Sequence, residues 1–472
     1  MKKNIYVIFD IGKTNKKCLL FDENNELIEE QQEVYAEIKD EDGFPCDDLA
    51  RLTEGVLSNW EKLKNDERFE VKGVNFTAYG ASFVYLDKNN QPVAPLYNYL
   101  KPMPDDLAQQ FYNSIEHQFN QTKEAFAAAT CSPTMGLLNS GLQLYFLKYS
   151  KPTIYEKVET ALHLPQYLSF LISGKKYSDF TSIGCHTALW DFTKNDYHDW
   201  IKIEGIDRKL APITTHAIAT KLPDGTLVGV GLHDSSSALL PYSAEQNDPF
   251  MLISTGTWCI NLNSFNQTPL LPRSARSDNE NLMNRDCLSY MTPQGNMTKA
   301  SRVFFGKEHD YQVERIAEHF KVEKDFYKTI KYTNQNPKTD FISACMEGTG
   351  PFPQKTEGVW DIAVYLTAEE AYIALMRGLM DILKVSIGLI DNAVPTFFID
   401  GGFARNALFM GMLKNDFPHK NIKTLDAPQA TALGALLFLK KDKILIFNKF
   451  QLFQLLILKF VITEIWNLKS LE

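Results

Sequence analysis

Paired cysteines, an excess of positive charge and a long uncharged apolar run are all missing from this sequence. None of its seven cysteines belongs to a Cys-x-x-Cys pair, so neither a structural zinc site nor a disulfide framework is expected. The net charge of −9 argues against a nucleic-acid surface, which is usually basic. The longest uncharged run of the apolar C-terminal segment, residues 450–458, is far shorter than the roughly 20 residues that span a bilayer. We therefore expect a reducing compartment, and neither nucleic acid nor membrane as a partner.

A secretory signal is also missing from the start of the chain. Met1 to Asn4 lead directly into the first expected strand, so we expect a cytoplasmic protein. With 472 residues, the chain is too long for a single hydrophobic core, and at least two domains are expected. An apolar content of 44% and a charged content of 23% are ordinary for a globular enzyme and leave the reaction open.

The beginning of the chain carries the first candidate site. Residues 6–22 contain two apolar runs around a tight turn with Asp10 and Gly12, a pattern typical of a β-hairpin. Glycine lets the backbone approach a bulky anion, and the turn N–H groups, Thr14 and the neighbouring lysines can surround phosphate oxygens. Asp10, at the strand end, could hold a hydrated Mg²⁺. By itself, the pattern fits an ordinary hairpin with a solvated turn equally well.

Further polar residues follow two later strands. Residues 71–76 form an expected strand that leads into a small-residue turn with Gly80, the place where open α/β sheets bind ligands. Residues 228–240 run from a strand through His233 and Asp234 into a serine-rich helix start. A carboxylate at such a junction is well placed to accept a proton from a bound hydroxyl. The alternative is that Asp234 only caps the helix, a role for which aspartate is preferred.

The second half of the chain repeats the strand–turn–strand pattern. Residues 250–262 contain two apolar strands around a hydroxyl-rich turn that holds Gly256 and Thr257. One such hairpin carries little information, because short glycine turns are common. Two of them, one in each half of a chain, favour a duplicated fold that closes on one shared nucleotide.

Residues 396–406 predict where the base of that nucleotide lies. A buried strand over 396–399 is followed by Gly401 and Gly402, whose bare backbone lets a flat ring lie close. Asn406 could fix such a ring by hydrogen bonds. We expect the small-residue helix within residues 424–435 to pack behind this adenine site.

These motifs, taken together, resemble those of the FGGY carbohydrate kinases, within the actin-like, Hsp70 and sugar-kinase group of ATPases. The resemblance covers about residues 5–440 and includes a first phosphate motif, a second phosphate motif, a segment with the catalytic aspartate and an adenosine motif. In that order they are Asp10-x-Gly12-x-Thr14-x-x-Lys17, Ser254-Thr255-Gly256-Thr257-Trp258, Gly231-Leu232-His233-Asp234 and Gly401-Gly402-x-x-x-Asn406.

The resemblance implies an α/β fold of two actin-like (ribonuclease H-like) ATPase domains with a central cleft. We expect an N-terminal FGGY domain over residues 1–243 that binds the sugar and carries the catalytic aspartate. A C-terminal FGGY domain over residues 244–440 would bind the nucleotide. Residues 441–472 are an apolar tail that does not match the family ending.

The resemblance also implies roles for individual residues. Asp234 would be the general base toward the sugar hydroxyl, and Asp10 would contact the metal. The sugar would lie against Gly80, His233, Asp234 and Ser235. ATP would contact Gly12, Lys13, Thr14, Asn15, Lys17, Gly256, Thr257, Gly401, Gly402 and Asn406.

Within the family, the sequence is most similar to rhamnulokinases and related deoxyketose kinases. The expected function is phosphorylation of a rhamnulose- or fuculose-like ketose, with ATP and Mg²⁺ as cofactors. Alternatives are a xylulose or other pentulose kinase, a non-catalytic ATP-binding switch of the actin or Hsp70 type, and a sugar sensor. A homodimer is left open. Lys13, Phe403 and Gln429 depart from the family pattern, and Lys13 could contact phosphate or point to solvent.

Overall fold

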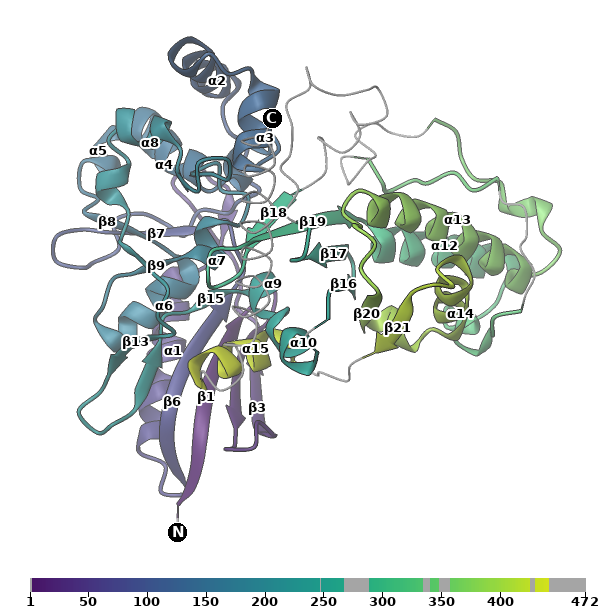
Figure 1. Cartoon of the computed structure of the whole chain (residues 1–472), viewed down its shortest axis with the longest axis horizontal. Coiled ribbons are helices and arrows are strands. Elements are labelled where there is room, and N and C mark those ends of the chain that lie inside the picture. The colour runs from purple at the N-terminus through teal and green to yellow at the C-terminus, as the bar shows by residue number, and fades with distance from the viewer. Residues whose placement is uncertain are drawn as a thin grey trace, which may run out of the picture.

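The computed structural model of the protein describes residues 2–246, 248–266, 288–333, 340–347, 357–424 and 429–440. Two groups of elements lie side by side, one mainly from the first half of the chain and one from the second (Figure 1). Within the described ranges, none of the helices combines the length and the apolar character needed to cross a bilayer. The apolar tail predicted for residues 441–472 lies outside these ranges.

The first sheet has the strand order β13-β14-β6-β1-β2-β3, and β15 also pairs with β6. The strands are β1 (Lys3–Ile11), β2 (Lys16–Phe21), β3 (Leu27–Glu33), β6 (Phe69–Ala78), β13 (Ile218–Lys221), β14 (Leu227–Gly229) and β15 (Leu232–His233). β1 pairs antiparallel with β2, whereas β1, β14 and β15 all pair parallel with β6. The hairpin predicted for residues 6–22 is thus confirmed.

The second sheet has the strand order β18-β19-β17-β16-β20-β21. The strands are β16 (Phe250–Thr255), β17 (Cys259–Asn263), β18 (Leu288–Met291), β19 (Met297–Val303), β20 (Thr396–Gly401) and β21 (Asn421–Thr424). β16 pairs antiparallel with β17 and parallel with β20, as β1 does with β2 and β6. The two sheets therefore share one pattern, and the predicted second hairpin is confirmed.

Helices surround both sheets. Those of the first half are α1 (Leu49–Lys64), α2 (Asp105–Phe119), α3 (Lys123–Thr130), α4 (Gly141–Ser150), α5 (Pro152–Tyr155), α6 (Leu164–Ser173), α7 (Phe180–Ile183), α8 (Asp199–Ile203), α9 (Asp234–Ser237) and α10 (Leu240–Glu245). Those of the second half are α12 (Phe305–Phe320), α13 (Ala368–Gly388), α14 (Ala407–Asp416) and α15 (Ala430–Lys440).

Short strand pairs complete the described fold. They are β4 (Ile38–Lys39) with β5 (Pro45–Cys46), β7 (Phe83–Leu86) with β8 (Thr160–His163), β9 (Ser178–Asp179) with β12 (Ile213–Thr214), and β10 (Trp190–Asp191) with β11 (Asp196–Tyr197).

The first sheet is covered on both faces because successive side chains of a strand point to opposite sides. On β1, Val7 and Phe9 belong to the apolar cluster that includes Trp60 of α1. Ile8, between them, belongs to a different cluster that includes Leu436 of α15. The long uninterrupted apolar run of β1 is thus explained by burial on both faces.

Helix α15 crosses back from the second half of the chain to the first sheet, next to β1 and β6 (Figure 1). The side-chain amide of Asn75 on β6 donates to the Ala435 carbonyl at 2.8 Å, and the Ser237 hydroxyl of α9 donates to the Thr431 carbonyl at 2.7 Å. A Cβ on Gly434 would lie 1.9 Å from the Ser237 carbonyl oxygen. The expectation that this helix backs the adenine site is therefore wrong: its small residues permit close packing against α9.

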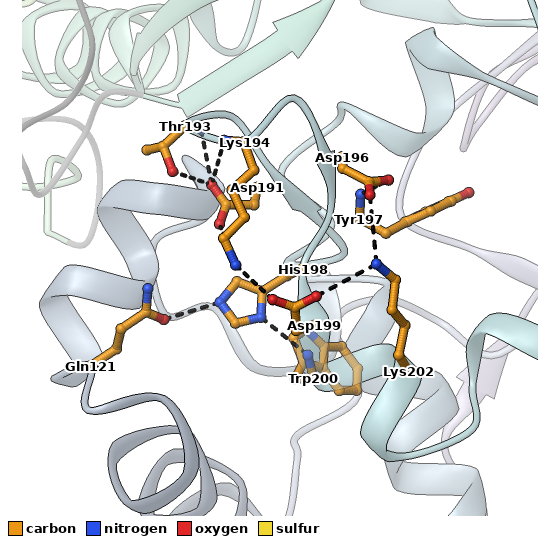
Figure 2. A network of polar contacts seen from close by, with 10 residues as sticks. All are labelled: Gln121, Asp191, Thr193, Lys194, Asp196, Tyr197, His198, Asp199, Trp200 and Lys202. Carbon is orange, nitrogen blue, oxygen red and sulfur yellow. Dashed lines mark hydrogen bonds and ion pairs between the residues drawn. The ribbon is translucent and has the colours of Figure 1, made fainter.

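A polar network links the β10–β11 hairpin to α8 and to Gln121, which lies just before α3 (Figure 2). His198 caps α8, because its Nδ1 accepts from the Trp200 backbone N–H at 3.2 Å while its Nε2 lies 3.0 Å from the Gln121 side-chain oxygen. Burial lowers the pKa of His198 to about 4. Asp191 accepts from the backbone and the hydroxyl of Thr193. A neutral ring that accepts at one nitrogen and donates at the other makes His198 a structural residue.

The close approach of α15 to α9 gives a stability prediction. Gly434→Ala should lower the free energy of unfolding by roughly 1–3 kcal/mol, because the new methyl meets backbone that cannot rotate away. Urea titration followed by circular dichroism measures the change. Gly388→Ala, at the end of α13 where a Cβ meets no atom within 4 Å, is the matched control and should cost nothing. Equal stability of the two variants would contradict the packing described.

Candidate active site

Residues predicted from distant parts of the sequence meet at one edge of the first sheet. Asp10 on β1 and Leu232 on β15 both pair with Thr77 of β6, one from each side. Parallel strands end at the same edge of a sheet. Asp234, which directly follows β15, therefore lies at the edge where Asp10 is the next-to-last residue of β1. The charge of Asp234 acts on Asp10 and raises its pKa. The structure therefore brings the two predicted carboxylates together.

Asp10 is a half-buried carboxylate with a raised pKa. Burial raises the pKa of Asp10 to about 6, against an ordinary value of 3.8. The Thr431 hydroxyl of α15, which donates to Asp10 at 2.8 Å, and the charge of Lys17 partly offset this rise. A carboxylate held in this way gains stability when a cation arrives. It could therefore serve as the predicted metal ligand.

Asp234 opens α9 but does not cap it. The N-cap residue is His233, and its side chain makes no capping hydrogen bond. Asp234 Oδ1 instead accepts from the backbone N–H of Ser235 at 2.5 Å and from its hydroxyl at 3.2 Å. The Asp234 side chain keeps 31% of its surface exposed. The alternative that Asp234 only caps the helix is therefore wrong, and its carboxylate is partly accessible to a ligand.

Gly80 and His233 are in direct contact. A Cβ on Gly80 would lie 2.7 Å from His233 Cδ2 and 2.9 Å from the Cys185 sulfur. His233 Nε2 lies 3.2 Å from both Asp234 Oδ1 and Cys185 Sγ, and its ring packs against Tyr290 of the second sheet. Burial lowers the pKa of His233, although Asp234 raises it. Three of the predicted sugar-binding residues, with Ser235 beside them, thus lie together.

The first turn is closed by one backbone hydrogen bond, from Gly12 N–H to the Asn15 carbonyl at 2.9 Å. Thr14 and Asn15 are exposed at its tip. Lys17 on β2 pairs with Asp10 on β1. Its amine lies 2.9 Å from a carboxylate oxygen of Glu30 and donates a hydrogen bond to the side-chain oxygen of Gln429 at 2.9 Å. The Gln429 departure thus provides a neutral acceptor for Lys17.

Lys13 neither points to solvent nor is free of partners. Its amine lies 2.5 Å from Asp47 Oδ2 and 2.9 Å from Glu37 Oε1. Burial lowers the pKa of Lys13, but the two carboxylates outweigh burial and raise it. The solvent expectation is therefore wrong, and contact between Lys13 and ATP stays a prediction.

The second turn lies against β20 and α12. Gly256 and Thr257 are exposed, and Gly256 N–H donates to the Trp258 carbonyl at 2.8 Å. Gly401 has a φ of 85°, and a Cβ there would lie 1.8 Å from the Thr255 carbonyl oxygen. Only glycine fits that position, because both the backbone conformation and the space require it. Packing thus explains Gly401 without any ligand.

Asn406 makes hydrogen bonds within the fold, whereas packing does not require a glycine at Gly402. Gly402 is exposed, and a Cβ there would meet no atom within 4 Å, so packing does not require glycine. The side-chain oxygen of Asn406 caps α14 by accepting from Phe409 N–H, and its amide donates to the Tyr372 hydroxyl. Phe403, the second departure, packs its ring against Phe305 and His309. Open backbone at Gly402 suits a flat ligand.

Sequence reasoning missed the roles of two residues near these groups. Asp47, which directly precedes the N-cap residue of α1, binds Lys13 and Lys16. Thr431 was assigned to a small-residue helix, but it donates to Asp10. Arg302 of β19 lies over the Trp258 ring. Burial lowers the pKa of His186 near His233, and the charge of Arg302 lowers it further. Nothing local in the sequence signals any of these long-range contacts.

Two family models match this chain in succession. The N-terminal domain of the FGGY family of carbohydrate kinases matches residues 5–239, and the C-terminal domain of carbohydrate kinase FGGY matches residues 247–445. The chain belongs to the FGGY family of carbohydrate kinases. This family consists of phosphotransferases with an alcohol group as acceptor, which is the enzyme class expected from the sequence. The predicted family membership is confirmed.

Three sugar kinases are similar to this chain at 21–24% sequence identity. The rhamnulokinase of Oceanobacillus iheyensis is 24% identical over 53% of this chain and 54% of that protein, so the chain spans about half its length. The rhamnulokinase of Bacillus subtilis is 22% identical over 92% of this chain and 89% of that protein. The L-fuculokinase of Escherichia coli is 21% identical over 93% of this chain and 92% of that protein.

Two solved structures of sugar kinases share the fold. A carbohydrate kinase from Novosphingobium aromaticivorans matches with a TM-score of 0.73 and 22% identity over 93% of this chain and 92% of that chain. A ligand-bound xylulose kinase from Lactobacillus acidophilus matches with a TM-score of 0.74 and 14% identity over 93% and 89%. The predicted α/β fold of two actin-like ATPase domains is therefore confirmed.

The raised pKa of Asp10 gives a pH prediction. In metal-free buffer, the free energy of unfolding of the wild type should fall relative to that of Asp10→Asn as pH rises from about 3.8 to about 6. Between those values the folded state binds more protons than the unfolded state, so rising pH removes stability. Urea titrations at several pH values measure the difference. Parallel pH curves for the two proteins would show that Asp10 titrates normally.

Proposed function

We propose that this protein transfers the γ-phosphoryl group of ATP to a hydroxyl of a ketose. The observation that carries the proposal is the repeated sheet pattern. Each sheet contains a hairpin with an exposed glycine turn: β1–β2 in the first sheet and β16–β17 in the second. Asp234 directly follows β15, which pairs with β6 as β1 does. Two turns that hold one triphosphate, with a carboxylate beside them, supply the positioning and charge stabilisation that phosphoryl transfer needs.

In this proposal, ATP would lie between the two halves of the protein. The exposed turns at Gly12 to Asn15 and at Gly256 and Thr257 would bind the phosphates through backbone N–H groups and hydroxyls. The adenine would lie over Gly402, where the backbone is open. In this proposal residues 1–243 bind sugar and residues 244–440 bind nucleotide, except that α15 belongs spatially to the first sheet.

Asp10 is the residue that would hold Mg²⁺. Its half-buried carboxylate has a raised pKa, so a nearby cation would favour the ionised form. When bound, the ion would neutralise charge on the phosphates. Among the described residues, no three His, Cys, Asp or Glu side chains gather into a metal site. A single carboxylate suits Mg²⁺, which usually takes one or two carboxylates together with substrate phosphates.

Asp234 would act as the general base. Its exposed carboxylate would accept the proton of the attacking hydroxyl, while His233 and Gly80 shape the site around the sugar. The names of the relatives favour a rhamnulose- or fuculose-like deoxyketose. The xylulose kinases among the structural neighbours keep a pentulose as the second candidate. We place the reaction in the cytoplasm.

A switch of the actin or Hsp70 type, or a sugar sensor, would need no base beside a buried sugar site. A switch hydrolyses ATP without sugar, and a sensor binds sugar without turnover. The accessible carboxylate of Asp234, with Gly80 and His233 in contact beside it, favours a kinase over both.

Asp234→Asn should lower ketose-dependent turnover by roughly 10²-fold or more, because no group then accepts the hydroxyl proton. ADP release with a panel of ketoses, rhamnulose first, measures turnover and identifies the substrate. Asp207→Asn, the same change at an exposed position, is the control and should turn over normally. Near-normal turnover of Asp234→Asn would contradict the role of Asp234 as the general base. ADP release in the absence of sugar would favour an ATP-binding switch over a kinase.

Gly402→Val should raise the KM for ATP by roughly tenfold or more, because side-chain atoms would occupy the space proposed for the adenine. The KM for the ketose and the free energy of unfolding should stay at wild-type values, since a Cβ at this position meets no protein atom. Gly402→Ala should give a smaller rise. An unchanged KM for ATP in both variants would remove Gly402 from the site.

A further inference from the structure

Asp47 lies at the centre of a buried cluster that the mechanism above does not use. It directly precedes Asp48, whose side chain caps α1 by accepting from Arg51 N–H at 2.9 Å. Asp47 itself takes no part in that cap, because its side chain points into the fold and only 8% of it is exposed. The helix start therefore explains why an aspartate stands at Asp48 but not why one stands at Asp47.

Three donors converge on the Asp47 carboxylate. The Lys13 amine lies 2.5 Å from Oδ2, the Lys16 amine lies 3.0 Å from Oδ1, and the Tyr79 hydroxyl donates to Oδ2 at 2.8 Å. Burial alone raises the pKa of Asp47, but the hydrogen bond from Lys13 and the charges of both lysines outweigh it and lower the pKa. Asp47 is thus a buried anion at neutral pH, held by two amines and one hydroxyl.

Through Lys16, Asp47 fixes the direction of the phosphate turn. The Lys16 amine donates to the Gly12 carbonyl at 3.2 Å and to the Lys13 carbonyl at 2.7 Å, and only 4% of the side chain is exposed. A trans peptide points its C=O and its N–H to opposite sides. Because both carbonyls face Lys16, the N–H groups of Lys13 and Thr14 face away from it. Backbone donors are thereby oriented before any phosphate arrives.

Through Tyr79, the same carboxylate reaches the sugar side of the site. Tyr79 follows β6, and its backbone N–H donates to the Ile11 carbonyl at the end of β1 at 3.1 Å. The next residue is Gly80, against which His233 packs. A shift of Tyr79 would therefore move the backbone that contacts His233. Asp47 lies between the segment proposed to hold phosphate and the segment proposed to hold sugar.

We propose that Asp47 is a positioning residue that preorients the phosphate turn and couples it energetically to the sugar side of the site. This inference rests on the proposed function, because it assigns the two sides of the site to ATP and ketose. Asp47 can release Lys13 toward bound phosphates without becoming an unpaired buried anion, because Lys16 and Tyr79 still hold it. Binding of either substrate then favours binding of the other.

The test measures the affinity for a non-hydrolysable ATP analogue with Mg²⁺, with and without the ketose that supports ADP release, by calorimetry on the full chain. In the wild type, the ketose should tighten analogue binding by about fivefold or more, within the usual range of coupling between sites. Asp47→Asn should weaken analogue binding and abolish this tightening. Asp48→Asn, the same change one residue later, is the matched control and should retain the full tightening, because an asparagine oxygen can still accept the capping hydrogen bond from Arg51 N–H.

Tyr79→Phe provides an independent arm in case Asp47→Asn does not fold. It removes only the hydroxyl that joins Asp47 to the sugar side. The proposal predicts near wild-type affinity for the analogue alone, together with loss of the tightening by ketose. A purely structural role would instead change stability and leave the coupling intact. Retained coupling in Tyr79→Phe, or equal coupling in Asp47→Asn and Asp48→Asn, would overturn the proposal.

The outcomes separate this inference from the proposed function. A wild type that releases no ADP with any ketose refutes the function. In that case the analogue alone still tests the phosphate half, because Asp47→Asn must bind it more weakly than Asp48→Asn does. Equal affinities of those two variants would overturn the positioning role whatever the activity of the wild type.

Discussion

Parallel pairing of β1 and β15 with the two sides of β6 is the constraint on which the proposed site depends. It makes the carboxyl ends of separate chain segments meet at one edge, where Asp10 lies near the end of β1 and Asp234 follows β15. A slip of one residue would turn every side chain of a strand to its other face, and burial on both faces of β1 opposes such a slip. Helix α15 then reaches the same edge, where Thr431 binds Asp10.

Local sequence patterns predicted the strands and turns, because short-range interactions along the chain determine them. Alternation and glycine turns located both hairpins, and a buried strand before two glycines located β20. The partners of charged side chains were beyond this reasoning, because ion pairs such as Lys13 with Asp47 depend on how distant segments pack. The position of α15 was mistaken for the same reason: small residues predict close packing but not the partner. Only the fold identifies α9 as that partner.

The strand pattern shared by the two sheets is the feature of the fold on which the proposed function rests. Each sheet ends one hairpin in a glycine turn, but the two turns differ in charge. Lysines and carboxylates surround the first turn, whereas glycine and hydroxyl groups form the second. We propose that the first half thus supplies charge and the base, and that the second supplies neutral donors and the space for adenine. Asp47 would then keep two neighbouring amines at the first turn in place, at the cost of burying a carboxylate.

The central claim is that both turns hold the phosphates of one ATP molecule. A crystal structure with a non-hydrolysable ATP analogue, Mg²⁺ and the ketose tests it most directly. The account predicts that the β- and γ-phosphates accept hydrogen bonds from the turn at Gly12 and from the turn at Gly256, with a sugar hydroxyl beside Asp234. Phosphates bound by only one of the two turns, or a sugar away from Asp234, would contradict it.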